Sequence, residues 1–337
     1  MITNNLVFFK KVFLLFVTVT ICISCLVGCV GMFSLEEHGS GNDKANNAVS
    51  GNTAAKETGN IITNESEVTE TASPTNAPVL DGNNAADDKS LKITYLDVGQ
   101  GDSAFVELSN GKTMLIDASE TIASDDIISY ISECGYKKID YLVATHPHAD
   151  HIGGMRAVVE AFDIGEIYMP KVSRNTLTYE RLLLSIASKN LRIKAATAGM
   201  SICEGVDIIA PNSEKYEDLN NYSIVIKIIH GNRKFLFMGD AEALSENEIM
   251  SAGFDVSADV VKVGHHGSGT SSTESFIKAT GAKYAVFSVG EGNSYNHPHS
   301  FVVERWQNAG AGIYRTDLSG NIYVTSDGVN INIISEK

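Results

Sequence analysis

The sequence predicts an α/β fold for residues 91–337, and two observations support this prediction. From residue 91 onward, short runs rich in Val, Ile, Tyr and Phe alternate with segments of helical periodicity. Motifs of His, Asp and Gly follow directly after several of these runs, where layered α/β folds place their functional sites. The 337 residues are 43% hydrophobic, which is enough for a large buried core.

The first half of this region is expected to begin with strands and to continue with alternating helices and strands. An Asn-Gly pair at 110–111 between two apolar runs is typical of a hairpin turn. The expected elements are strands over 91–98, 104–108 and 113–117, a helix over 125–134, a strand over 141–145, a helix over 155–162, a strand over 164–169 and a helix over 179–188.

The second half repeats the mixture of strands and helices. Short strands lead to residue 210, and Gly231-Asn232 joins the next two strands as a hairpin. The expected elements are strands over 223–230 and 234–238, a helix over 243–252, a strand over 259–263, a helix over 274–280, a strand over 284–288, a helix over 301–309 and three terminal strands.

Residues 1–29 have the pattern of a lipoprotein signal peptide. Lys10 and Lys11 precede an apolar run over 12–26, which is short for a membrane-spanning helix. The run ends in Leu-Val-Gly-Cys, which resembles a bacterial lipobox whose cysteine becomes lipidated. We therefore expect an exported protein held at the outer face of the cytoplasmic membrane through Cys29. An uncleaved signal anchor is the alternative.

Residues 30–90 are expected to form a disordered polar tether. They contain ten acidic residues, three lysines and no hydrophobic periodicity. Such a segment buries too little apolar surface to offset the entropy lost on ordering. The tether would hold the domain of residues 91–337 away from the membrane.

The charge distribution limits the possible partners. The formal net charge of −15 argues against a protein that binds long nucleic acid mainly through bulk charge. Residues 171–194 are a local exception, with six cationic side chains and one acidic one. This segment is either a phosphate-facing strip or a solvated helix face.

The strongest chemical motif is His-Pro-His-Ala-Asp-His at 146–151, directly after a hydrophobic strand. Gly239-Asp240 and Gly264-His265-His266-Gly267 follow two later strands. Imidazole and carboxylate ligands without a thiolate suit zinc, iron or manganese. Four such side chains on one short loop can hardly all bind the same ion. The motif therefore indicates two ions, with a carboxylate from another strand between them.

These motifs resemble the metallo-β-lactamase superfamily. Within this superfamily, three further motifs resemble the C-terminal domain of ComEC-type competence proteins. They are Asp-Val-Gly-Gln-Gly-Asp-Ser at 97–103, Asn-Tyr-Ser at 221–223 and Tyr-Asn-His-Pro at 295–298. The resemblance covers 91–337 and implies a four-layer αββα sandwich with metals at the edge of its two sheets. We expect a free-standing, exported version of that domain.

The resemblance also implies roles for individual residues. One metal would be bound by His146 and His148, and the second by the next Asp-His pair of the loop, with Asp240 bridging them. Either His265 or His266 would complete the second site, and His265 is preferred. The implied metal ligands are His146, His148, Asp150, His151, Asp240 and His265.

Four further residues are expected around the metals or the substrate. Asp117 matches an aspartate that orients the site without binding metal. Asp102 lies on a loop that could shape the cleft wall. His266 directly follows His265, the preferred ligand, and is the alternative to it. Asn221 occupies the region where most of the superfamily has a further histidine, which leaves the first metal site one ligand short.

The predicted reaction is hydrolysis by a hydroxide bridged between two divalent ions, zinc or manganese. Asp150 would steer the proton, Asp240 would bridge the ions, and His297 would hold a phosphate or protonate a leaving oxygen. For His297, a structural role in capping the next helix is equally open. A phosphodiester suits two cations, which favours a phosphodiesterase. The resemblance to ComEC-type proteins implies that it is a nuclease related to DNA uptake.

Several alternatives remain open. A hydrolase of the same fold could act on cell-wall phosphodiesters, phosphocholine, lactones or, least favoured, β-lactams. A surface-tethered binding protein with low turnover and a structural lipoprotein that only holds metal are the non-enzymatic alternatives. The expected partners are a phosphodiester or another small ester, nucleic acid and the membrane, while the oligomeric state is not indicated.

Overall fold

The computed structural model of the protein describes residues 89–337. The predicted signal peptide and all but the last two residues of the predicted tether therefore lie outside the described residues. No helix within 89–337 is long and apolar enough to cross a membrane.

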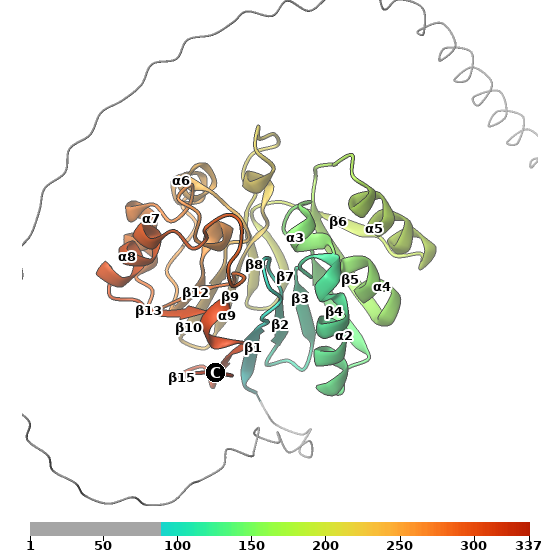
Figure 1. The fold of residues 1–337 in the computed structure, drawn as a ribbon, viewed down its shortest axis with the longest axis horizontal. Coiled ribbons are helices and arrows are strands. Elements are labelled where there is room, and N and C mark those ends of the chain that lie inside the picture. Colours follow the sequence, from blue (N-terminus) through green and yellow to red (C-terminus); the bar gives the residue numbers. More distant parts are fainter. Residues whose placement is uncertain (1–88) are drawn as a thin grey trace, which may run out of the picture. The chain divides into compact units, whose positions relative to one another are not determined.

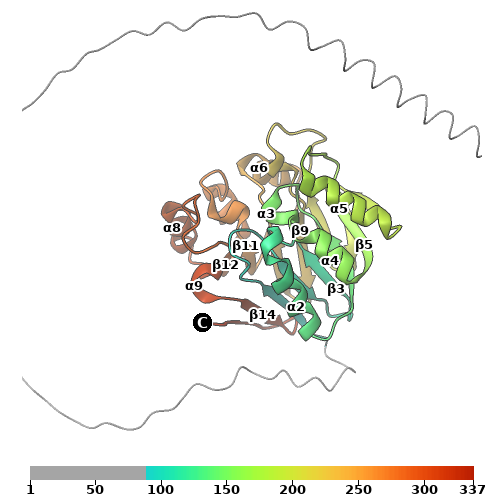
Figure 2. The same cartoon turned by 45° about the vertical axis from the view of Figure 1, so that its right-hand side comes forward.

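Two mixed β-sheets pack face to face in this region, and helices cover the outer face of each (Figures 1 and 2). The first sheet has the order β15 (Ile331–Ser335), β14 (Ile322–Ser326), β1 (Leu91–Tyr95), β2 (Ala104–Glu107), β3 (Thr113–Ile116), β4 (Lys138–Val143), β5 (Asp163–Pro170) and β6 (Ile193–Ala196). The second has the order β13 (Gly312–Arg315), β12 (Tyr284–Phe287), β11 (Val260–Lys262), β10 (Arg233–Phe237), β9 (Val225–His230), β8 (Val206–Ala210) and β7 (Met200–Cys203).

Each sheet is antiparallel in one part and parallel in the other. Strands β3 to β6 pair in parallel, as do β10 to β13, while the remaining pairs are antiparallel. Parallel neighbours need long crossover connections, and helices provide most of them. The carboxyl ends of several strands therefore meet at one edge of each sheet.

The helices form the two outer layers. Over the first sheet lie α2 (Ser124–Glu133), α4 (Met155–Ala161) and α5 (Leu177–Ser188), and over the second lie α6 (Ala243–Ser251), α7 (Glu274–Thr280) and α8 (Ser300–Asn308) (Figure 1). The structure thus confirms the predicted four-layer αββα sandwich.

The alternation of side chains along the strands explains the layering. In β10, Phe235 and Phe237 pack into the core between the sheets, while Leu236 packs under the second helical layer. In β4, Tyr141 faces the other sheet and Leu142 faces the first helical layer. Because successive strand residues point to opposite faces, the part of a strand that is covered on both sides is apolar, as over 141–143 of β4 and 235–237 of β10.

Two short α-helices were not predicted. Helix α3 (Ala149–Ile152) overlaps the His and Asp motif at 146–151, and α9 (Thr316–Ser319) follows β13. A four-residue helix is too short to show helical periodicity in the sequence. The helices that the sequence did predict, and the three terminal strands, are confirmed, with ends shifted by a few residues.

Candidate metal centre

The predicted site residues lie together at the edge where the parallel strands end. The loop after β4 carries 146–151, the loop after β10 carries Asp240, and the loop after β11 carries 265–266. Asp102 lies between β1 and β2, and Asp117 directly follows β3. This is the position at which open α/β sheets bind their ligands.

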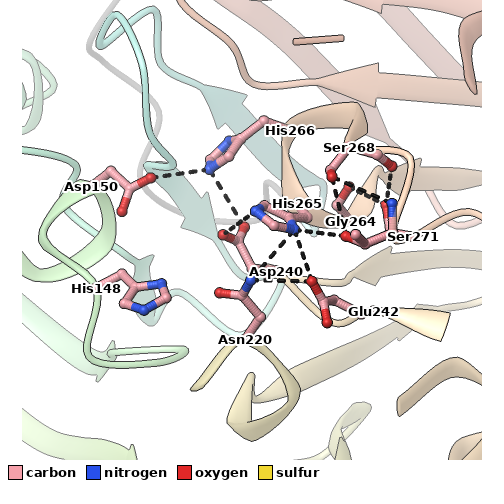
Figure 3. A network of polar contacts seen from close by, with 12 residues as sticks. His148, Asp150, Asn220, Asp240, Glu242, Gly264, His265, His266, Ser268 and Ser271 are labelled. Atoms are coloured by element: carbon pink, nitrogen blue, oxygen red, sulfur yellow. Dashed lines mark hydrogen bonds and ion pairs between the residues drawn. The ribbon is translucent and has the colours of Figure 1, made fainter. Parts of the chain in front are cut away.

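Asp240 lies at the centre of the site and faces two groups of ligand-type side chains (Figure 3). We refer to them as the four-residue cluster and the three-residue cluster. The former contains Asp150, His151, Asp240 and His266, and the latter contains His146, His148 and Asp240.

In the four-residue cluster, Oδ1 of Asp240 lies 3.2 Å from Nε2 of His151 and 3.5 Å from Nε2 of His266. Oδ2 of Asp150 lies 3.4 Å from Nε2 of His266 and 4.0 Å from Nε2 of His151. Ligands bound tetrahedrally at typical zinc distances are roughly 3.3 Å from one another. The spacing of these four donor atoms therefore fits a single divalent ion.

The three-residue cluster uses the other oxygen of Asp240. Its Oδ2 atom lies 3.6 Å from Nε2 of His146, and that nitrogen lies 3.0 Å from Nδ1 of His148. The two carboxylate oxygens of Asp240 thus face different clusters, as expected of a bridging ligand.

Hydrogen bonds at the far side of each ring fix how the histidines face the clusters. Nδ1 of His151 lies 2.7 Å from Oδ2 of Asp117, and this carboxylate also accepts hydrogen bonds from the backbone and hydroxyl of Thr145. With the Nδ1 proton donated to Asp117, the Nε2 lone pair of His151 is left facing the cluster. Asp117 therefore occupies the orienting position that the sequence predicted.

His266 is oriented in the same way by the second sheet. Its Nδ1 donates to the carbonyl of Ser288 at 2.9 Å and lies 3.2 Å from Oδ1 of Asp102. Asp102 is in turn ion-paired with Lys262, and both side chains are buried. The Nε2 lone pair of His266 consequently points into the four-residue cluster.

Three buried atoms in the four-residue cluster have no hydrogen-bond partner among residues 89–337. They are Nε2 of His151, Nε2 of His266 and Oδ1 of Asp240. An unsatisfied buried polar atom is costly, and three of them facing one another is unusual unless they bind a ligand. Nitrogen and carboxylate donors are those that zinc and similar divalent ions bind, so these residues fit such an ion.

The local electrostatics agree with a cation site. Burial opposes a charge on His151, but the carboxylates of Asp240, Asp117 and Asp150 outweigh it and raise the pKa of His151 well above its usual value. Burial, reinforced by the neighbouring His151, lowers the pKa of His146 well below its usual value. The surplus carboxylate charge thus favours a cation at this position, and a bound divalent ion would take the place of the proton on the imidazole.

The arrangement reverses the sequence-based preference for His265 over His266. Nε2 of His265 lies 3.8 Å from Oδ2 of Asp240, and its Nδ1 faces Oε1 of Glu242 at 3.3 Å (Figure 3). His265 therefore belongs to neither cluster. Both residues have a left-handed backbone, with φ of 48° and 51°, and this turn directs the adjacent rings to different sides. The sequence does not encode that turn visibly.

Asn221 does not replace the missing histidine at the metal centre. Its side chain contacts Glu242 and accepts hydrogen bonds from the backbone at the start of α6. Ser223 is nearer, because its hydroxyl lies 3.4 Å from Nδ1 of His146 and accepts a hydrogen bond from the backbone of Asp240. The three-residue cluster consequently has one donor fewer than the four-residue cluster.

His297 lies beside the clusters on the loop after β12. Its Nδ1 is buried without a hydrogen-bond partner among the described residues. Burial, reinforced by His265 and His266, lowers the pKa of His297 to about 4. Its ring lies 6.4 Å from that of His266, so the structure places this predicted residue at the site.

An open cavity of about 320 Å³ exposes the site to solvent. Six of the residues that line it have no individual role in the sequence analysis: Gln100, Glu120, Ala149, Arg174, Asn220 and Tyr295. Of the cationic segment 171–194, Arg174 reaches this cavity, whereas Lys194 pairs with Glu166 and Lys189 donates to backbone carbonyls. Of the six cationic side chains in that segment, Arg174 alone belongs to the lining of this cavity.

Two residues of the site could have been found from the sequence. Lys262 interrupts the apolar run Asp-Val-Val-Lys-Val-Gly, and a buried lysine requires a carboxylate partner. Thr145 directly precedes the metal motif. Glu242 gives no such signal, because an acidic residue at the start of a helix is common.

Comparisons with known proteins agree with this geometry. Residues 96–291 match the metallo-β-lactamase superfamily. ComE operon protein 3 of Bacillus subtilis is 29% identical over 252 residues, which are 68% of this chain and 32% of that protein. Competence protein ComA of Neisseria gonorrhoeae is 29% identical over 239 residues, which are 70% of this chain and 32% of that protein.

The chain therefore spans about a third of the length of these relatives. Among solved structures, the metallo hydrolase Igni18 from Ignicoccus hospitalis aligns with a TM-score of 0.47 and 15% identity, covering 69% of this chain and 98% of that one. The predicted resemblance to ComEC-type competence proteins is confirmed. Since the superfamily match covers more than half of the chain, the protein belongs to the metallo-β-lactamase superfamily.

Proposed function

We propose that the protein is an exported, membrane-tethered phosphodiesterase that uses two divalent metal ions, zinc or manganese. One observation carries this proposal: the two oxygens of Asp240 face separate clusters of ligand-type side chains. A carboxylate shared in this way is what a two-metal hydrolytic site requires. The ligands would be Asp150, His151 and His266 on one side, His146 and His148 on the other, and Asp240 between them.

Ions bound there would activate a water molecule near neutral pH and stabilise the negative charge that develops on a phosphodiester. The chain supplies positioning and proton transfer. Asp150 has a side chain 24% exposed, unlike Asp240 at 2%, and can receive a proton from a water molecule in the cavity. His297 would donate a hydrogen bond to a phosphate oxygen.

The similarity to competence proteins supports a nucleic acid as the diester, because the relatives include one named for competence. The cell-wall diesters and phosphocholine considered above would need the same metal chemistry, so the metal centre alone does not separate these substrates. Selection among them depends on the side chains around the cavity.

Metal content and hydrolysis measured on one preparation test the proposal. The full chain, purified in detergent, is expected to carry about two divalent ions and to hydrolyse bis(p-nitrophenyl) phosphate. Asp240→Ala should abolish both. His230→Gln is the matched control, because His230 lies at the other end of the β9–β10 hairpin and contacts Ser326. A metal-loaded wild type without turnover would favour the surface binding protein.

Export and tethering rest on the lipobox-like sequence that ends at Cys29, outside the described residues. Cys29→Ser is expected to release the protein into the medium or to leave it unprocessed. Labelling with a radioactive fatty acid should fail in this variant and succeed in Cys25→Ser. Unchanged labelling of Cys29→Ser would refute the proposed anchor.

A further inference from the structure

Three aromatic rings form a column that leads from the metal centre to the surface. The ring of His266 is 6.4 Å from that of His297 with 26° between their planes, and Tyr295 follows at 5.7 Å and 23°. His266 is 1% exposed and Tyr295 is 61% exposed. The column therefore begins at the four-residue cluster and ends on an exposed tyrosine at the rim of the cavity.

The loop that carries Tyr295 is held by the side chain of Asn293. Its amide nitrogen donates to the carbonyls of Gly290 and His297 at 2.9 and 2.6 Å. Its oxygen accepts from the backbone nitrogens of Tyr295 and His297 at 3.2 and 3.0 Å. The tyrosine is thus held in place by its backbone while its outer ring face is left to solvent.

The exposure of Tyr295 differs from that of the neighbouring Phe301, which is 44% exposed. Phe301 has the ring of His299 at 5.5 Å and the guanidinium of Arg305 at 5.0 Å. Among residues 89–337, Tyr295 has His297 as its ring partner, and no cation lies over its ring. A fixed, exposed ring with one vacant face is a stacking surface.

Arg174 lines the same cavity as Tyr295 and contributes a charge. Its guanidinium forms no hydrogen bond or ion pair within residues 89–337, whereas Arg156, Arg233 and Arg315 each pair with a carboxylate. An unpaired guanidinium beside a phosphodiesterase site is suited to bind a phosphate oxygen.

We propose that Tyr295 and Arg174 position the substrate: an unpaired nucleobase stacks on the outer face of Tyr295, and Arg174 binds a phosphate that flanks the scissile one. This inference rests on the proposed phosphodiesterase function and specifies its substrate as single-stranded nucleic acid. A base within a duplex has both faces covered by its neighbours and would have to leave the stack to reach Tyr295. Diesters without a planar ring, such as wall polymers, would gain nothing from the tyrosine.

Binding to two oligomers of equal charge tests this proposal. Fluorescein-labelled oligothymidylate and an abasic oligomer of the same length are titrated into the full chain with chelator present, so that the readout is anisotropy and not turnover. The wild type should prefer oligothymidylate. Tyr295→Leu should weaken its binding roughly 5- to 100-fold and leave the abasic oligomer unaffected, because stacking is lost.

Two further variants separate stacking from charge. Tyr295→Phe keeps the ring and should bind like the wild type. Arg174→Gln should weaken both oligomers equally and reduce the salt dependence by about 0.7 in the logarithmic slope, as expected for one lost phosphate contact on a single strand. Thermal melting of each variant confirms that it is folded.

The inference is overturned if Tyr295→Leu affects both oligomers equally or neither, or if Arg174→Gln leaves both affinities unchanged. Failure of the proposed function looks different. A metal-loaded wild type that hydrolyses no diester, yet shows a base preference that depends on Tyr295, would refute the phosphodiesterase and retain the binding site. Hydrolysis without any base preference would refute the stacking role alone.

Discussion

Lys262 on β11 forms a buried ion pair with Asp102 on the loop between β1 and β2, so this pair links the two sheets beneath the metal centre. Asp102 also faces Nδ1 of His266 at 3.2 Å. The side chains of Lys262 and Asp102 are 4% and 7% exposed, and neither can recover the hydration it has lost. The pair thus connects the stability of the sandwich to the orientation of a proposed metal ligand.

Lys262→Met is expected to destabilise the protein by about 3–5 kcal/mol, because it leaves Asp102 buried without its cation. Urea unfolding in excess chelator measures this cost without a contribution from bound metal. Adding Asp102→Asn to Lys262→Met should restore part of the loss. Lys283→Met is the control, because Lys283 is 61% exposed and its pair with Asp259 should contribute less than about 1 kcal/mol. A cost for Lys262→Met as small as that of the control would contradict the prediction.

His266→Ala and His265→Ala are expected to differ in metal content. His266 contributes a donor atom to the four-residue cluster, so its loss should remove about one ion per chain. His265 belongs to neither cluster and pairs with Glu242, so His265→Ala should retain the wild-type content. Elemental analysis of the two variants, dialysed side by side, is the measurement. The opposite order would restore His265 as the ligand.

Asp240→Asn and His148→Ala are expected to give different stoichiometries. Asp240 is shared by both clusters, so its substitution should weaken both sites. His148 belongs to the three-residue cluster alone, so His148→Ala should leave about one ion bound by the other donors. Calorimetric titration of zinc into the metal-free proteins distinguishes these outcomes. Equal losses in the two variants would argue against separate sites bridged by Asp240.

The ion pairs of Asp255 predict a pH-dependent contribution to stability. Partial burial disfavours the charge on Asp255, but hydrogen bonds from Lys227, Ser257 and Lys234 outweigh it and hold the pKa of this carboxyl below its usual value of 3.8. A pKa that is lower in the folded than in the unfolded state stabilises the folded protein at pH values above the unfolded-state pKa. This stability is lost as the pH falls through the folded-state pKa. Asp255→Asn should therefore be less stable than the wild type at pH 7, by up to about 1 kcal/mol because the group is partly exposed.

This difference should shrink as the pH falls below about 4. Urea unfolding of both proteins at pH 7, 5 and 3.5 measures it. Asp163→Asn, which alters an exposed carboxylate on β5, serves as the control. A difference between the wild type and Asp255→Asn that is constant over this range would show that the ion pair does not account for it.

The sequence alone determined the family, the order of the elements and most of the metal centre. The metal motif at 146–151 can be recognised because its four ligand-type side chains lie within six residues directly after one strand, β4. The four-layer sandwich was implied by the family resemblance of these motifs, whereas the apolar runs themselves predicted the strands, as over residues 235–237 of β10. Asp117 and Asp240 could be placed because each follows a predicted strand.

The tertiary structure decided what depends on backbone direction and on contacts between the sheets. His265 and His266 are the same residue type at adjacent positions, and the left-handed turn decides which ring joins the four-residue cluster. The pairing of Lys262 with Asp102 and the approach of Arg174 and Tyr295 to one cavity join segments far apart in the chain. Local sequence patterns encode the elements, whereas these contacts exist only after the two sheets have packed.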